Sequence, residues 1–202
     1  IMNFFSIDCS TDIGSLFIKT KNKTFSKTLQ SDKSNNDLLM KQILDFFVEK
    51  NVKFEDITCI FVNQGPGNFS GLRGSLAIAK GISLSKNISL CGYNTFLWSC
   101  VKFFNKKDNI YSLIKFNNKY FIKKFEKNLK SNLRFKEITE DEIMKMYKDQ
   151  LIVIPKNFRE YFGKKILNLE NVNIADLDHN DLEFLRLKGL LDEELIKPLY
   201  LS

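Results

Sequence analysis

Short apolar runs rich in β-branched and aromatic residues alternate with longer amphipathic stretches along this chain, a pattern that predicts an ordered series of strands and helices. In the first half, the expected elements are strands at 3–8, 15–19 and 24–29, a helix at 36–50, a strand at 57–63, a helix at 71–86, a strand at 88–91 and a helix at 95–104. The polar stretch 105–109 interrupts this pattern, and the series then begins again. In the second half, the expected elements are strands at 110–116, 119–125 and 133–137, a helix at 140–147, a strand at 151–154, a short helix at 157–162, a strand at 166–169 and a helix at 174–188.

Both halves therefore approximate the order βββαβαβα, with the second copy reduced. Two such units in tandem describe an α/β chain with the duplicated ribonuclease H-like architecture of the actin, Hsp70 and sugar-kinase (ASKHA) superfamily. We expect an N-terminal lobe at residues 1–104 and a reduced C-terminal lobe at residues 105–202.

A glycine-rich loop within residues 64–75 joins the apolar strand at 57–63 to the following helix. Its glycines allow a tight turn and close approach to another surface. Ser70 is placed to cap the helix, whose free N–H groups could bind an anion. The alternative is a loop that merely turns the chain.

The helix after this loop carries a stripe with almost no side chain, because small residues recur every three or four positions: Gly74, Ala77, Gly81 and Ser85. Glycine inside a helix costs about 1 kcal/mol relative to alanine, so two on one stripe need a reason. Close approach of another backbone is the usual one. The sequence leaves open whether that backbone belongs to the same domain or to a second subunit.

The net charge of +7 suits an acidic partner or a nucleic acid, but the lysines are dispersed along the chain. No KH loop or RNP aromatic motif is visible. The four cysteines lie in or beside apolar runs without a Cys-x-x-Cys pair, which favours buried reduced thiols. Without a long apolar stretch or a signal-peptide pattern, we expect a cytoplasmic protein that does not enter the membrane.

Residues 5–11, FSIDCST, and residues 65–73, GPGNFSGLR, resemble the aiDTS strand and turn and the GPGSFTGLR signature of the TsaB (YeaZ) family. Residues 79–81, AKG, and 197–201, KPLYL, are similar to its helix and its P-x-Y-L-R ending. The chain departs from the family in two places: Asn35 or Asn36 stands where members commonly have a histidine, and Ser202 replaces the final arginine.

The resemblance implies a non-catalytic scaffold or activator in bacterial synthesis of N6-threonylcarbamoyladenosine in tRNA. The implied partners are a TsaD-like catalytic homologue, a TsaE-like ATPase and, through the complex, tRNA. The complex would use ATP with Mg²⁺ and threonylcarbamoyl-adenylate, whereas this chain alone would bind no cofactor. The sequence leaves open whether the free chain is a homodimer or a monomer.

We expect the helices at 36–50 and 71–86 to form the partner surface, because one offers large apolar side chains and the other a nearly bare stripe. The residues assigned to this surface are Leu39, Ile43, Phe47, Ser70, Gly71, Arg73, Gly74, Ala77, Ile78 and Gly81.

A vestigial phosphate-binding turn is assigned to Asp8, Ser10 and Thr11, since catalytic members of the superfamily hold Mg²⁺ and phosphate with an aspartate and hydroxyls after the first strand. A second phosphate turn and an adenosine-binding glycine cluster are not evident in the second half. His179, the single histidine, cannot alone supply a metal site or a Ser-His-Asp triad. We assign no catalytic and no metal-binding residue.

Two other functions stay open at this point. A small ASKHA-type kinase or ATPase would use Asp8 and Ser10 and would hydrolyse nucleotide in isolation. A direct tRNA-binding module, suggested only by the charge, would bind tRNA in a salt-dependent manner.

Overall fold

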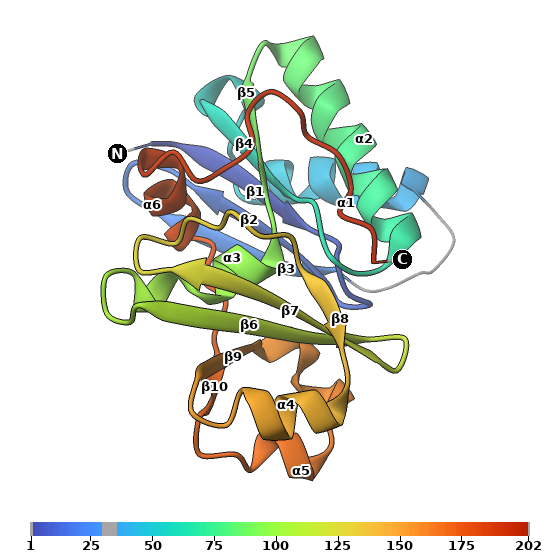
Figure 1. The fold of residues 1–202 in the computed structure, drawn as a ribbon. Helices are drawn as coiled ribbons and strands as arrows, with labels where there is room; N and C mark the ends of the chain where they lie inside the picture. Colours follow the sequence, from blue (N-terminus) through green and yellow to red (C-terminus); the bar gives the residue numbers. More distant parts are fainter. Residues whose placement is uncertain (1, 30–35, 202) are drawn as a thin grey trace. The chain divides into compact units, whose positions relative to one another are not determined.

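The computed structural model describes residues 2–29 and 36–201, which form two units, each built on one five-stranded sheet (Figure 1). The first unit runs to Asn94 and resumes at Leu182, and the second comprises Thr95–Asp181. This division differs from the expected boundary after residue 104, because helix α3 (Thr95–Ser99) belongs to the second unit and the chain from Leu182 onward to the first.

The first sheet has the strand order β3-β2-β1-β4-β5. Its strands are β1 (Phe4–Asp8), β2 (Gly14–Lys19), β3 (Thr24–Leu29), β4 (Cys59–Asn63) and β5 (Ser89–Tyr93). The pairs β1–β2 and β2–β3 are antiparallel, whereas β1–β4 and β4–β5 are parallel. Every residue of β1 and β4 is buried, as expected for central strands that are covered on both faces.

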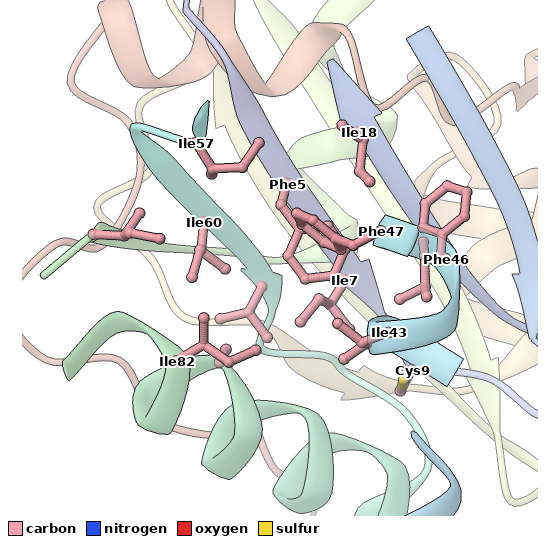
Figure 2. Close-up of a cluster of buried hydrophobic side chains, with 14 of the residues drawn as sticks. Phe5, Ile7, Cys9, Ile18, Ile43, Phe46, Phe47, Ile57, Ile60 and Ile82 are labelled. Carbon is pink, nitrogen blue, oxygen red and sulfur yellow. The ribbon is translucent and has the colours of Figure 1, made fainter. Parts of the chain in front are cut away.

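Helices α1 (Asn36–Glu49) and α2 (Phe69–Lys86) pack on the same face of this sheet and share one hydrophobic cluster with it (Figure 2). Phe47 of α1 meets the ring of Phe5 edge-on at 5.0 Å. It also stacks at 4.1 Å on Phe54, in the 3₁₀-helix η1 (Phe54–Asp56). Ile82 brings α2 into the same cluster, so the two helices and the sheet form one core.

The segment after helix α6 (Asp181–Leu187) covers the edge of β5. Gly92 and Asp192 exchange two backbone hydrogen bonds, of 2.7 and 3.0 Å. Earlier in this region, Lys19 of β2 forms an ion pair of 2.8 Å with Glu183. At Gly92, the backbone N–H and C=O groups of the edge strand β5 are therefore paired.

The second sheet has the order β10-β9-β6-β7-β8. Its strands are β6 (Asn109–Phe116), β7 (Lys119–Glu126), β8 (Lys136–Ile138), β9 (Leu151–Pro155) and β10 (Val172–Ala175). The pairs β6–β7 and β7–β8 are antiparallel, and β6–β9 and β9–β10 are parallel. Counted within each repeat, this is the strand order and pairing of the first sheet, which confirms the duplicated ribonuclease H-like fold.

The helices of the second repeat are short, which confirms that this copy is reduced. They are α4 (Glu140–Met146), the 3₁₀-helix η3 (Lys156–Tyr161), α5 (Lys164–Leu167) and α6 (Asp181–Leu187). Thr139 and Glu142 form a capping box at the start of α4.

The last helix of each repeat is grouped with the other unit. Helix α3 (Thr95–Ser99), followed by the 3₁₀-helix η2 (Val101–Phe103), packs on β6 and β9 in the second unit. Residues from Leu182 onward in α6 belong to the first unit. The expected boundary followed the order of elements along the sequence, so it placed α3 in the first lobe and α6 in the second.

The predictions near the C-terminus were wrong in two places. Residues 166–169, expected as a strand, include the end of α5, and the expected start of the last helix is occupied by β10. Asn171 fixes this segment by donating two side-chain hydrogen bonds of 2.8 Å to the carbonyls of Tyr147 and Gln150. Short apolar runs do not distinguish a strand from a single helical turn, so periodicity could not settle these elements.

All four cysteines are buried and none forms a disulfide, as expected. Within residues 2–29 and 36–201, no helix combines the length and the apolar character that crossing a bilayer requires.

Candidate functional site

Three segments singled out in the sequence meet in the first unit: the turn after β1, the glycine loop after β4 and the C-terminal segment. The N–H of Asn68 donates to the carbonyl of Ser10 at 2.7 Å. The N–H of Leu199 donates to the carbonyl of Gln64 at 2.7 Å, and the Gln64 amide donates to the carbonyl of Lys197 at 3.0 Å. Because β1 and β4 are parallel neighbours, the segments that follow them emerge at one edge of the sheet.

Glycine is required in this loop because its backbone lies directly on the turn after β1. A Cβ atom on Gly67 would lie 1.8 Å from the carbonyl oxygen of Ser10, and one on Gly71 would lie 2.5 Å from that of Cys9. Gly65 has a φ of +109°, a conformation that other residues rarely adopt. These glycines therefore serve contacts within the first unit.

Asp8 is the buried centre of this turn. Its Oδ1 accepts hydrogen bonds from the N–H of Ser10 at 3.0 Å, from the Ser10 hydroxyl at 2.6 Å and from the Asn63 amide at 3.0 Å. Burial raises the pKa of Asp8 above its ordinary value, and the hydrogen bonds from Ser10 and Asn63 act in the opposite direction. The other assigned member, Thr11, donates its hydroxyl to the carbonyl of Ile13 at 3.0 Å.

The residue that caps α2 is Asn68 and not Ser70. The Asn68 Oδ1 accepts from the N–H groups of Ser70 and Gly71, at 3.1 and 3.3 Å. The helix begins at Phe69, two residues before the expected start, so the capping position moves with it. The amides that could have bound an anion are occupied by this side chain.

The hydrogen-bonding groups of this turn are directed to other groups of the first unit. One oxygen of Asp8 accepts three hydrogen bonds, and the N–H groups of Ser70 and Gly71 in α2 are bound by the Asn68 side chain. In the described part of the chain, no group of three or more His, Cys, Asp or Glu side chains could hold a metal ion. The arrangement is typical of a turn that stabilises the fold.

His179 lies in the second unit, where its ring meets Trp98 edge-on at 4.9 Å. Burial lowers the pKa of His179 to about 4, so its imidazole is neutral at physiological pH. This packing explains the residue without a role in catalysis.

The residues assigned to the partner surface divide into buried and exposed sets. On α1, Ile43 and Phe47 lie inside the core and Leu39 is packed partly against it, which corrects their assignment as an outward apolar face. The large apolar side chains that α1 exposes are Leu44 and Val48, with 44% and 80% of their surface accessible. The prediction failed because a helix covering a sheet directs its largest apolar residues inward.

On α2, only some of the residues assigned to the partner surface are exposed. Gly74 is buried, and Gly71 and Ile78 are half-buried. The exposed members are Ser70, Arg73, Ala77 and Gly81. A Cβ on Gly81 would have no neighbour within 4 Å, so the chain's own packing gives no reason for this glycine.

Two aromatic residues that the sequence analysis did not assign stand beside Arg73. The guanidinium of Arg73 lies 5.1 Å from the centre of the Phe69 ring, which in turn lies 5.1 Å from that of Tyr200. Phe69 and Tyr200 are 52% and 48% exposed. Phe69 lies in the motif at 65–73 and Tyr200 in the motif at 197–201, so their presence in these motifs was the available signal in the sequence.

Comparisons with known proteins agree with these motifs. The sequence model of TsaD, described as tRNA N6-adenosine threonylcarbamoyltransferase, matches residues 30–110. A tRNA threonylcarbamoyladenosine biosynthesis protein TsaB from Buchnera aphidicola subsp. Baizongia pistaciae is 30% identical over 83 residues, which are 41% of this chain and 38% of that protein. TsaB from the Acyrthosiphon pisum subspecies is 24% identical over 143 residues, 69% of this chain and 64% of that protein. The matched regions thus span less than two thirds of these curated relatives.

Two solved structures share the fold over the full length of both chains. A Pseudomonas aeruginosa protein described as similar to peptidase YeaZ has a TM-score of 0.73, with 13% identity and 100% of each chain covered. YeaZ from the same organism has a TM-score of 0.71, again with 13% identity and full coverage of both chains. The ordered motifs and the names of the sequence relatives support the resemblance to the TsaB (YeaZ) family, and these solved structures show that the chain has the YeaZ fold.

Proposed function

We propose that this chain is a non-catalytic scaffold and activator subunit in the synthesis of N6-threonylcarbamoyladenosine in tRNA. Support for the pathway comes from the names of its sequence relatives and from the TsaD match to residues 30–110. Support for a role without catalysis comes from the Asp8 turn, whose hydrogen bonds are directed to its own loop.

The observation that carries a docking role is the bare outer stripe of α2. Ala77 and Gly81 are exposed, and Gly81 faces open space although glycine weakens a helix by about 1 kcal/mol. Helix α1 packs beside α2 and exposes Leu44 and Val48. A partner helix could approach the backbone of α2 at Gly81 and cover these apolar side chains.

The occupant of this surface in the proposal is a TsaD-like catalytic homologue. A TsaE-like ATPase and tRNA would join through the complex, which would use ATP with Mg²⁺ and threonylcarbamoyl-adenylate. The free chain would use the same surface in a homodimer. No cofactor is proposed for this chain alone.

The test is co-purification with the TsaD-like protein of the same organism. Gly81→Leu fills open space in the isolated chain, so folding should be preserved while the side chain blocks close approach. Overpacking of about 1 to 3 kcal/mol would weaken association up to about a hundredfold. Gly163→Leu, at another glycine whose Cβ would have no neighbour within 4 Å but in the second unit, is the matched control. Wild-type affinity of the Gly81→Leu variant would rule out this surface.

A further inference from the structure

The positive charge of this chain is concentrated in one part of the second unit. Residues 95–181 contain 17 basic and 12 acidic residues, a net charge of +5, whereas the rest of the chain contains 14 and 12, a net charge of +2. Within the second unit, eight basic residues fall between Lys115 and Lys136, where Glu126 is the only acidic residue. This segment of net charge +7 runs from the end of β6 through β7 to the start of β8 (Figure 1). Along the whole sequence, the lysines had looked dispersed.

The register of the sheet brings part of this charge together with aromatic rings. Lys124 of β7 lies directly opposite Tyr111 of β6, so the two side chains share one face of the sheet. Lys136 pairs in register with Ile122, two residues from Lys124, and therefore lies on that same face. The Lys136 ammonium is 6.0 Å from the centre of the Tyr147 ring, and that ring meets Tyr111 edge-on at 5.1 Å.

The loop between β7 and β8 follows directly along the chain and carries further exposed cations. Lys130, Arg134 and Lys136 are all exposed. Within the described residues, none of these three has a carboxylate within ion-pairing distance, whereas Lys119 pairs with Glu137 at 3.2 Å. The loop is held in place, because the Ser131 hydroxyl donates to the carbonyl of Lys124 at 2.6 Å. Lys130 and Arg134 are thus presented from an ordered loop, whereas Lys136 lies close enough to Glu142 to help lower the pKa of that carboxylate.

We propose that this surface, Tyr111, Lys124, Lys130, Arg134 and Lys136, binds RNA through its phosphate backbone. Several exposed cations on an ordered surface attract the phosphate groups of a nucleic acid, and counterion release favours such binding. The half-buried ring of Tyr111 offers a face on which an unpaired base can stack. The choice of tRNA as the RNA rests on the proposed function, which this inference deepens by giving the chain a tRNA contact of its own.

The experiment measures binding of the full chain to a fluorescently labelled tRNA transcript over a range of NaCl concentrations. The test variant is Lys130→Gln/Arg134→Gln/Lys136→Gln, and the matched control is Lys21→Gln/Lys23→Gln/Lys53→Gln, three exposed lysines of the first unit. Each variant loses three charges from the net +7, which leaves +4. The test variant should bind about tenfold or more weakly, with the slope of log K against log salt reduced by about 2, because each lost phosphate contact contributes about 0.7. The control should stay within about twofold of wild type.

Absence of tRNA binding by the wild-type chain at low salt, or equal losses in the two triple variants, would overturn the proposal. The single variant Lys130→Gln, with an expected decrease in slope of about 0.7, provides the same test should the triple variant fold poorly. Parallel co-purification with the TsaD-like protein separates the two proposals, because that association depends on α2. If the triple test variant no longer co-purified with the TsaD-like protein but bound tRNA as wild type does, the basic surface would be assigned to a protein partner. This result would also overturn the inference.

Discussion

Gly67 and Ser10 meet backbone to backbone, at a distance that leaves no room for a side chain on Gly67. A Cβ there would lie 1.8 Å from the Ser10 carbonyl oxygen, and the same oxygen accepts the N–H of Asn68 at 2.7 Å. The glycine loop is thereby fixed on the turn that follows β1, and the start of α2 is fixed with it. This contact gives the family signature a physical explanation that does not require a bound ligand.

Gly67→Ala should destabilise the isolated chain by about 1 to 3 kcal/mol or more, since backbone on both sides of the contact must move. Gly81→Ala is the matched control on the same structural unit, and it should stabilise the chain by about 0.5 to 1 kcal/mol because the site is open and helical. Urea unfolding of the three proteins measures both effects. Equal stability of Gly67→Ala and wild type would mean that the loop does not need this contact.

Much of the fold could be predicted from the sequence because the strands of the first unit are short, apolar and separated by clear polar turns. The duplication was visible for the same reason. The sequence could not show that the last helix of each repeat is grouped with the other unit, because element order carries no information on which sheet a helix covers. It also could not distinguish α5 from a strand, since one buried residue, Ile166, fits either.

The candidate site was located by its motifs, but the roles within it depended on geometry. Asn68 and Ser70 are both good capping residues, and only the start of the helix decides between them. Likewise, Ile43 and Phe47 have the spacing of an apolar helix face, which predicts burial but not whether a sheet or a partner provides it.

Asp8→Asn and Asp8→Ala separate a structural role from a metal-binding role. Alanine leaves three hydrogen-bond donors without their acceptor, at a cost of about 1 to 3 kcal/mol. Asparagine keeps an acceptor oxygen in place and removes the burial of a charge, so its stability should stay within about 1 kcal/mol of wild type. Thermal melting with and without Mg²⁺ and ATP checks the alternative, a small kinase or ATPase. A Mg²⁺-dependent rise in melting temperature, or ATP turnover lost in both variants, would favour that enzyme.

Arg73→Lys retains the charge but loses the planar guanidinium beside Phe69. Arg73 is exposed, and its side chain has no ion pair with any described residue, so the melting temperature should change little. Association with the TsaD-like protein should weaken, since we propose that the guanidinium pairs with a partner carboxylate or phosphate. Lys80→Arg, an exposed reverse substitution on the same helix, is the control. A large loss of stability with complex formation preserved would assign Arg73 to the fold.

His179 should make the folded state sensitive to mild acid. Its pKa is lowered to about 4 from an ordinary value of about 6.5, because burial against Trp98 disfavours the charged imidazolium. Between these two values, the unfolded chain takes up a proton that the folded chain does not, so the free energy of unfolding falls as the pH is lowered from about 6.5 to 4. The contribution of the neutral His179 imidazole to the free energy of unfolding is fully present above about pH 6.5. His179 is partly accessible, which makes the effect smaller than for a completely buried ring.

The variant His179→Phe keeps an aromatic ring beside Trp98 but cannot titrate. Urea unfolding at pH 7 and pH 5 should show a smaller loss of stability for this variant than for wild type. Carboxylates with lowered pKa values, such as Glu183 beside Lys19 and Asp176 beside Lys156, lose their stabilising ionisation as the pH falls in both proteins, so the difference between the two reports on His179. The same pH dependence in both proteins would mean that the imidazole is hydrated and takes up its proton in the folded state.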